Sequence, residues 1–326
     1  MRRFDYVSAR SIEETVAALG QDGDIRPLAG GTDLLTMMKA DITAPSILID
    51  IKRVPDLSGI RFVQGEGLTL GGLTTLAEIE TNDVIRRRYP MLAEAASLAA
   101  TPQLRNMATL GGNLLQRPRC WYFRSSHFHC WLKGGDQCQA REGENQFHAL
   151  FGDRPCCAVH PSDLALVLVA LDAEILLRGN EGERTLPIGE FFQLPDDDRR
   201  TETIARPDEL ITAVRIPPMP DNACGVYLKA MDRKVWAFAL ASVAAILTLD
   251  GTRIADARLV LGGVAPIPWR ATAVESSLRG ANADSATIDR AARTALADAE
   301  SLQHNAYKIP LTTSLVRRAL TACVGR

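Results

Sequence analysis

Hydrophobic and polar positions in the first 55 residues predict a small α/β unit. Ser11 can cap a helix that runs to Leu19, and Glu14, three residues further on, can complete a capping box. A compact β-branched run at 46–51 is typical of a buried strand. Between the two, a short extended run ends in a glycine turn at 30–33, after which helical spacing resumes.

The chain from residue 56 to about 220 mixes strands with helices. A second capping box, formed by Thr75 and Glu78, precedes one of the helices. The expected elements are paired strands at 60–63 and 68–71, helices after Thr75 and from Pro90 to Ala100, regular structure over 162–175, and a strand at 210–216. That strand stops at two prolines, which makes 217–221 the best linker candidate in the chain.

Beyond that linker, the pattern predicts strands followed by amphipathic helices. Strand-rich stretches cover 225–249 and 254–264, and helices are expected at about 285–300 and 312–324. The last helix places its apolar residues on one face: Leu315, Val316, Ala319 and Leu320. The linker therefore separates two regions of different character.

The segment from 116 to about 160, called the insert below, differs from the rest of the chain. It contains Trp, His, Cys, Arg and Gly without a sustained period of 2 or 3.6 residues. A structureless loop of roughly 40 residues inside a domain is uncommon unless something orders it. The insert therefore needs an explanation of its own.

Composition and charge exclude several classes of partner. The chain has 326 residues, 46% hydrophobic and 23% charged, which is ordinary for a globular protein of about two domains. A net charge of −2 gives no electrostatic basis for binding nucleic acid or an anionic membrane. The longest apolar stretches, 164–171 and 238–249, are too short for a membrane span. No apolar segment follows the basic start, so we expect no signal peptide of its own.

Two glycine turns are candidates for binding phosphate groups. Gly30-Gly31-Thr32 lies between an extended and a helical run, and Gly111-Gly112-Asn113 repeats this arrangement about 80 residues later. Consecutive amides without side chains can form a concave nest for phosphate oxygens. Each turn alone is more often a simple tight turn, but two favour a ligand with two phosphates. Neither matches the glycine fingerprint of a Rossmann nicotinamide site.

Five of the seven cysteines fall within the insert and allow three chemistries. Disulfide bonds need an oxidising compartment, and five thiols leave one unpaired. Structural zinc usually draws its ligands from close pairs, whereas the gaps here are long; His127 and His129 could add ligands. An iron–sulfur cluster needs four thiolates and tolerates wide spacing, because its irons lie at separate corners. We rank iron–sulfur first, zinc second and unligated thiols last. Because Cys156 and Cys157 are adjacent, one of them is expected to be a spectator.

Two further polar positions each have a structural and a functional interpretation. Ser162 or Asp163 can cap the buried apolar element that follows, or can reach the ribose side of a nucleotide. Lys229 lies in a predicted strand and would ordinarily be a solvated charge.

Together these motifs resemble a known family. Leu28–Leu35 (LAGGTDLL) and Ala108–Leu115 (ATLGGNLL) look like the two flavin-phosphate loops of the FAD-binding medium subunit of molybdenum hydroxylases, the xanthine dehydrogenase and carbon monoxide dehydrogenase group. The similarity continues in order through nearly the whole chain, in the segments His160–Leu166, Asp208–Pro217, Tyr227–Ala245 and Leu261–Ala271.

The fold implied by this resemblance is α+β. Residues 1–220 would form a two-subdomain FAD-binding domain of the vanillyl-alcohol-oxidase type, with subdomains at about 1–55 and 56–220 and the insert at about 116–160. Residues 221–326 would form a smaller C-terminal α+β domain of the CO dehydrogenase flavoprotein type.

The insert is similar to a subset of the family that carries an extra [4Fe–4S] cluster. That subset includes the FAD subunit of periplasmic aldehyde oxidoreductases and the beta subunit of 4-hydroxybenzoyl-CoA reductase, and the segments HPSD and GGVAPIPWR look closer to the former. By position in that pattern the cluster ligands would be Cys120, Cys130, Cys138 and Cys156, while Cys157 falls where the family has an ordinary apolar residue.

The resemblance also implies a set of FAD contacts. Two of them, Leu210 and Lys229, match positions near the isoalloxazine, and Trp236 stands where the family commonly has Tyr. The implied contacts are Arg26, Pro27, Leu28, Ala29, Gly30, Gly31, Thr32, Asp33, Leu34, Thr109, Gly112, Asn113, Ser162, Asp163, Leu210 and Lys229.

The activity implied is electron transfer within a three-subunit oxidoreductase. A large molybdopterin-binding subunit would oxidise the substrate, a small subunit with two [2Fe–2S] clusters would relay the electrons, and FAD here would pass them to an external acceptor. An aldehyde oxidoreductase is the first expectation; the alternatives are a 4-hydroxybenzoyl-CoA reductase-like beta subunit or a xanthine dehydrogenase FAD subunit. We expect no catalytic residue for the hydroxylation in this chain.

Two other classes of protein remain as rivals from the residues alone. A stand-alone flavin oxidase of the same fold would need a histidine for covalent flavin attachment near the first glycine turn, yet no histidine precedes His127. A zinc-stabilised binding module would have no redox role. The expected location is the cytoplasm, or the periplasm by export on a partner's twin-arginine signal.

Overall fold

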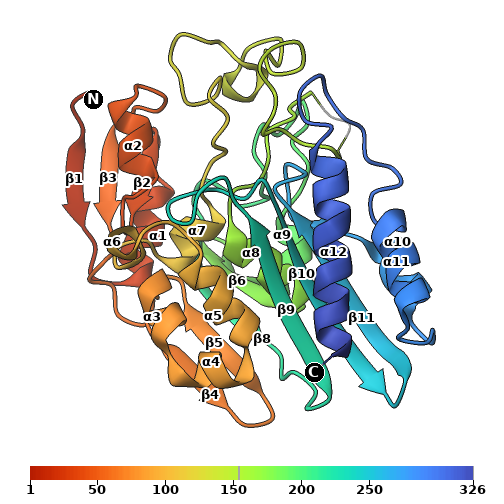
Figure 1. The fold of residues 1–326 in the computed structure, drawn as a ribbon. Coiled ribbons are helices and arrows are strands. Elements are labelled where there is room, and N and C mark those ends of the chain that lie inside the picture. The colour runs from red at the N-terminus through yellow and green to blue at the C-terminus, as the bar shows by residue number, and fades with distance from the viewer. Residues whose placement is uncertain (153–154, 326) are drawn as a thin grey trace.

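Three β-sheets and the helices packed against them form the fold (Figure 1). The computed structural model describes residues 1–152 and 155–325; residues 153 and 154 of the predicted insert and the final residue of the predicted C-terminal domain lie outside the described part. The mixture of helices and strands confirms the α+β fold class. None of the helices in the described ranges combines the length and apolar character needed to cross a membrane.

The N-terminal sheet has three parallel strands in the order β1-β3-β2. They are short, and the central strand buries Leu48 and Ile49. Ser11 caps the first helix by accepting from the backbone N–H of Glu14, but the Glu14 carboxylate accepts from Arg10, so the predicted capping box is incomplete. The elements are β1 (Asp5–Ser8), α1 (Ile12–Leu19), β2 (Ile25–Leu28), α2 (Leu34–Lys39) and β3 (Ile47–Asp50).

The second sheet has five antiparallel strands in the order β4-β5-β8-β6-β7. Thr75 and Glu78 form the predicted capping box in full. The strands are β4 (Ile60–Val63), β5 (Gly67–Gly71), β6 (Glu174–Gly179), β7 (Gly182–Pro187) and β8 (Leu210–Ile216). The helices between them are α3 (Leu76–Thr81), α4 (Asp83–Arg88), α5 (Pro90–Ser97), α6 (Pro102–Arg105), α7 (Leu110–Leu114), α8 (Asp163–Ala170) and α9 (Ile188–Phe191).

Helix α8 lies at the centre of the molecule. All eight of its residues are buried, and it packs against α5 on one side and against β10 and β11 of the third sheet on the other. A helix that is apolar all round is stable only when every face is covered. Its sequence, DLALVLVA, therefore joins the second and third sheets into one core.

The third sheet has four antiparallel strands in the order β12-β11-β10-β9. The long helix α12 packs on β9 and β10, and places Leu315, Val316, Ala319 and Leu320 in the core as expected. The elements are β9 (Ala223–Ala230), β10 (Ala241–Asp250), β11 (Arg253–Gly262), β12 (Trp269–Arg270), α10 (Thr272–Leu278), α11 (Ser285–Thr294) and α12 (Lys308–Val324).

The insert contains one 3₁₀ turn, η1 (Trp131–Lys133), in its described part. It runs as long loops between the N-terminal sheet and the upper end of α12 (Figure 1). The insert lacks periodic apolar positions, yet it has a small core of its own, on which Met37, Ile42 and Leu302 from outside also pack. Its buried members are Tyr122, Phe123, Cys130, Trp131, Leu132, Ala140, Cys156, Cys157 and Ala158. Apolar packing thus contributes to its order.

Candidate cofactor-binding site

The two glycine turns lie against each other. A Cβ atom on Gly30 would lie 1.7 Å from the carbonyl oxygen of Met107, so only glycine permits this approach. Gly31 has a φ of +69°, a left-handed conformation that favours glycine. The second turn is held by backbone hydrogen bonds from Gly111 to Gly72 and from Leu110 to Thr74, both 2.8 Å. Sequence positions about 80 residues apart are therefore adjacent in space.

A cavity of about 620 Å³ opens beside both turns. This volume is within the range of cofactor sites, which commonly occupy about 300–1,000 Å³. The predicted FAD contacts that line it are Arg26, Pro27, Leu28, Ala29, Gly30, Gly31, Thr32, Asp33, Leu34, Thr109, Gly112 and Leu210.

Four of the predicted contacts do not line this cavity. Two of them, Asn113 and Ser162, are joined to each other: the Ser162 hydroxyl donates to Asn113 Oδ1 at 2.5 Å and accepts from the backbone N–H of Ala165 as the cap of α8. Ser162 therefore takes the structural role that we considered for it. The hydrogen bond ties the second glycine turn to the central helix.

The other two predicted contacts outside the lining, Asp163 and Lys229, form a buried ion pair. The Lys229 ammonium is 2.8 Å from Asp163 and donates to the backbone carbonyl of Leu98 at 2.9 Å. The Tyr227 hydroxyl donates to the same carboxylate at 2.6 Å, and burial and that carboxylate raise the pKa of Tyr227. The Lys229 side chain is 0% exposed, so the expectation of a solvated charge is wrong.

Asp33 is surrounded by arginines at one wall of the cavity. Its carboxylate pairs with Arg119 at 2.6 Å and Arg124 at 2.8 Å, and it accepts from the backbone N–H of Arg117 at 3.0 Å. Burial lowers the pKa of Arg119 to about 10, with Asp33 acting in the opposite direction. Asp33 thus fixes the start of the insert to the first glycine turn.

Sequence reasoning missed the residues of 201–209 that line the cavity, although Leu210, which follows them, was predicted. Glu202 is buried there, and burial raises its pKa, while Arg117 lies 3.5 Å away. Two atoms of this pair, Glu202 Oε1 and Arg117 Nε, are buried without a hydrogen-bond partner among the described residues. Buried polar atoms normally have partners, so these atoms are suited to a polar ligand. No local pattern marked residues 201–207 as part of the site.

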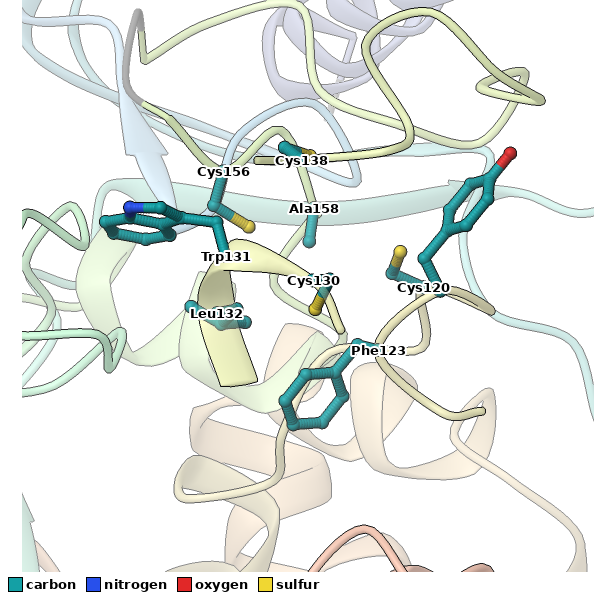
Figure 2. Close-up of a pocket in the computed structure, with 9 residues that line it drawn as sticks. Cys120, Phe123, Cys130, Trp131, Leu132, Cys138, Cys156 and Ala158 are labelled. Carbon is teal, nitrogen blue, oxygen red and sulfur yellow. The ribbon is translucent and has the colours of Figure 1, made fainter. Parts of the chain in front are cut away.

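The four cysteines predicted as ligands line a second, smaller cavity. Figure 2 shows them reaching it from separate segments of the insert, together with Phe123, Trp131, Leu132 and Ala158. The space between the side chains is about 10 Å³, roughly that of a water molecule. The four are Cys120, Cys130, Cys138 and Cys156. Cys157 does not line this cavity, although its sulfur is 3.6 Å from that of Cys138.

The thiols of the insert influence one another's protonation. Hydrogen bonds from Cys156 and Cys157 hold the pKa of Cys138 well below its usual range, and the same hydrogen bonds raise the pKa of both donors. Burial raises the pKa of Cys120 to about 11. Within 1–152 and 155–325, no group of three His, Cys, Asp or Glu side chains is arranged to hold a metal ion as it stands. A bound group would require the thiol side chains to move apart.

The two cavities share a wall. Phe123 and Leu132 line both, so a single layer of side chains separates the large cavity from the thiols. The guanidinium groups of Arg117 and Arg124 lie over the Phe123 ring, 5.2 and 5.7 Å from its centroid. Cation–π contacts of this kind hold an aromatic ring in place. The wall is therefore both thin and fixed.

Comparison with known proteins identifies the class. Residues 2–219 match the model of the FAD binding domain in molybdopterin dehydrogenase, and residues 226–323 match the CO dehydrogenase flavoprotein C-terminal domain. The chain belongs to this family of FAD-binding oxidoreductase subunits, which confirms the resemblance at family level.

Individual relatives extend over almost the full length. The chain is 36% identical to the aldehyde oxidoreductase FAD-binding subunit of Escherichia coli, over 95% of each chain. It is 32% identical to the carbon monoxide dehydrogenase medium chain of Hydrogenophaga pseudoflava, over 99% of this chain and 98% of that one. The solved structure of carbon monoxide dehydrogenase from Hydrogenophaga pseudoflava superposes with a TM-score of 0.80 at 29% identity, covering 99% and 98% of the two chains.

Proposed function

We propose that this chain is the FAD- and [4Fe–4S]-carrying electron-transfer subunit of a heterotrimeric molybdenum-dependent hydroxylase of the aldehyde oxidoreductase type. The observation that carries the proposal is the shared wall. A cavity of cofactor size and a site of four thiols are separated only by Phe123 and Leu132. Two redox groups placed so close together are suited to exchanging electrons.

FAD fits the large cavity by its chemistry. Bound there, FAD would supply the redox chemistry, and the chain's part is to bind and orient it. Bare backbone at Gly30 and Gly112 offers room for phosphate oxygens, and the unpartnered atoms of Glu202 and Arg117 offer polar contacts. The arginines around Asp33 neutralise a carboxylate that would otherwise repel a phosphate.

An iron–sulfur cluster fits the donor set of the small cavity. Four soft thiol ligands from separate segments surround one space, as a cluster with several iron corners requires. In this proposal Cys120, Cys130, Cys138 and Cys156 are the ligands, and Cys157 is a neighbour that is not needed. The thiols must open outward to accommodate the group.

The relatives support an inference about the partners of this chain and the type of enzyme. The family matches are to FAD-binding subunits and medium chains, so we infer a large molybdopterin-binding subunit, a small subunit with two [2Fe–2S] clusters, and an external electron acceptor. Identity is 36% to the aldehyde oxidoreductase subunit but 24% to the xanthine dehydrogenase FAD-binding subunit of Escherichia coli O157:H7, which favours the first type. The compartment in this proposal is that of the complex, cytoplasmic or periplasmic according to a partner's signal.

A spectrum and metal analysis of the purified protein test the proposal. We expect flavin bands together with broad absorption near 400 nm, and iron in the protein. Flavin bands without iron would contradict the cluster, zinc without iron would make the thiol site structural, and absence of flavin would contradict the whole assignment.

Single Cys→Ser variants then test the ligand set. Replacing Cys120, Cys130, Cys138 or Cys156 should release iron and remove the absorbance near 400 nm, because one iron loses its thiolate. The matched control is Cys157→Ser, which should keep the iron. FAD should remain in all five variants, since the glycine turns lie outside the insert and none of the five cysteines lines the large cavity. Loss of iron in Cys157→Ser with retention in Cys156→Ser would show that the ligands are misassigned.

A further inference from the structure

His148 is a buried histidine whose ring contacts one of the proposed ligands. Its Nε2 lies 3.2 Å from the sulfur of Cys120, and the residue is 3% exposed. Its other ring nitrogen, Nδ1, is buried without a hydrogen-bond partner among the described residues. Among the described residues, the sulfur of Cys120 is the side-chain hydrogen-bond partner of the ring.

The position of this ring is set by several neighbouring groups. Trp121 and Tyr122 flank it, with ring centroids 6.2 and 6.4 Å away. The backbone carbonyl of His148 accepts from Lys308 at 2.9 Å and from Asn305 at 3.2 Å, both at the start of the C-terminal helical region. A donor held on both its ring and its backbone has little freedom to turn away from the sulfur.

We infer that His148 is a positioning residue that donates a hydrogen bond from Nε2 to the Cys120 sulfur and so raises the reduction potential at the thiol site. This inference rests on the proposed cluster. A metal-bound thiolate carries no proton and can only accept, so the hydrogen must lie on Nε2. One-electron reduction adds negative charge to the cluster and its sulfurs. A hydrogen bond to sulfur stabilises the more negative, reduced state.

The contact differs from those of His127 and His129, which lie in the same insert. His127 and His129 are exposed, and the ring of His127 contacts the hydroxyl of Ser125. His148 alone among the three is buried against a thiol in the described structure. His127 therefore offers a matched control in the same segment.

The test compares His148→Phe, which keeps an aromatic ring but removes the donor, with His148→Gln, which keeps an N–H donor. The readout is the midpoint potential of the cluster in the purified complex, from a redox titration followed by electron paramagnetic resonance. We expect His148→Phe to disfavour reduction about tenfold, equivalent to about 59 mV for one electron. His148→Gln should retain much of the wild-type potential, and His127→Phe should leave it unchanged.

The outcomes separate this inference from the cluster proposal. An iron-loaded His148→Phe protein with the wild-type potential would overturn the role of His148. If His148→Phe loses its iron, the decision rests on His148→Gln. Restored iron content and potential in His148→Gln would support the hydrogen-bonding role of His148, and failure to restore them would overturn it. A wild-type complex without iron would overturn the cluster itself, and this inference with it. The potential of FAD, measured in the same titration, should not change.

Discussion

Gly30 and Gly31 are adjacent but are required for different reasons. Gly30 has no room for a Cβ, because the Met107 carbonyl occupies that space. At Gly31, an added Cβ would lie 2.9 Å from Cδ1 of Leu35. Gly31 also has a positive φ, which costs other residues about 1–2 kcal/mol. The sequence left two interpretations open for these glycines, a simple tight turn or a nest for phosphate. The structure adds that Gly30 allows the two turns to approach, whereas Gly31 allows its own turn to form.

Replacing Gly30 by Ala should therefore separate the two glycine turns and weaken FAD binding. The carbonyl of Met107 belongs to the backbone and cannot rotate out of the way, so one turn must shift. The ratio of flavin to protein after purification, read from absorbance, should fall well below that of the native protein.

Gly189→Ala is the matched control, because an added Cβ there meets nothing within 4 Å. It should keep its full flavin content. Equal flavin in the Gly30→Ala protein would mean that contact between the turns does not shape the cavity.

At the level of elements, helix α12 begins with a lysine that is fully buried. Lys308 is 0% exposed and donates to the backbone carbonyls of Phe147, His148 and Gly263 at 3.2, 2.9 and 2.5 Å. One ammonium group thus joins the helix to the insert and to the turn after β11. Burial lowers the pKa of Lys308 to about 7.

Lys308→Met should reduce stability and change its dependence on pH. Three buried carbonyls lose their donor, at a cost of roughly 1–3 kcal/mol for the group. Because the folded-state pKa lies below the unfolded value of about 10.4, the unfolded state binds more protons between pH 7 and 10. The native protein should therefore gain stability relative to the variant as pH rises through this window.

Chemical unfolding followed by tryptophan fluorescence at pH 7 and pH 9 measures both effects. A stability difference between native and variant that does not change with pH would contradict the lowered pKa of Lys308.

Elements with strong local patterns were predictable, and those ordered by distant contacts were not. Strand β8 has the expected bounds, Leu210–Ile216, because a β-branched run ends at two prolines. The hairpin of β6 and β7 was not expected beyond residue 175, since its outer strand alternates between exposed and half-buried positions. The apolar core of the insert was not predictable either, because its residues come from separate segments that are brought together only when the loops fold.

For the molecule as a whole, the ion pair of Asp163 and Lys229 connects the central helix to the third sheet. Asp163 begins helix α8, which shares a hydrophobic core with the second sheet, and Lys229 lies on β9 of the third. Breaking a buried pair by removing one partner typically costs about 3–5 kcal/mol, because the other charge stays buried alone. The pair therefore makes the two regions depend on each other.

Asp163→Asn should destabilise the whole protein by about that amount, and Lys229→Met by a similar amount. The double variant should lose less stability than the sum of the two single losses, because no charge remains unpaired. Thermal or denaturant unfolding of the four proteins completes the cycle. Additive losses would show that the two side chains act independently.

The candidate site was also predictable only in part, because some of its residues have a recognisable local pattern and others do not. Glycine turns and cysteines are recognisable from sequence alone, and they led to both cavities. Glu202 and His148 have no local pattern, and they become significant only where the fold places them against Arg117 and Cys120. Sequence alone identified the parts of the site that depend on residue type and missed those that depend on position.

The contacts between the insert and the start of α12 also have a consequence for the timing of biosynthesis. Lys308 donates to the carbonyl of His148, which lies 160 positions earlier in the chain. The backbone N–H of His304 donates to the side chain of Asn145, which lies 159 positions earlier. At about 5–20 residues per second, a ribosome reaches these partners roughly 8–30 s after it has finished the insert. The thiol site cannot reach its final form during that interval, so any metal must be delivered to a chain that is nearly or fully synthesised.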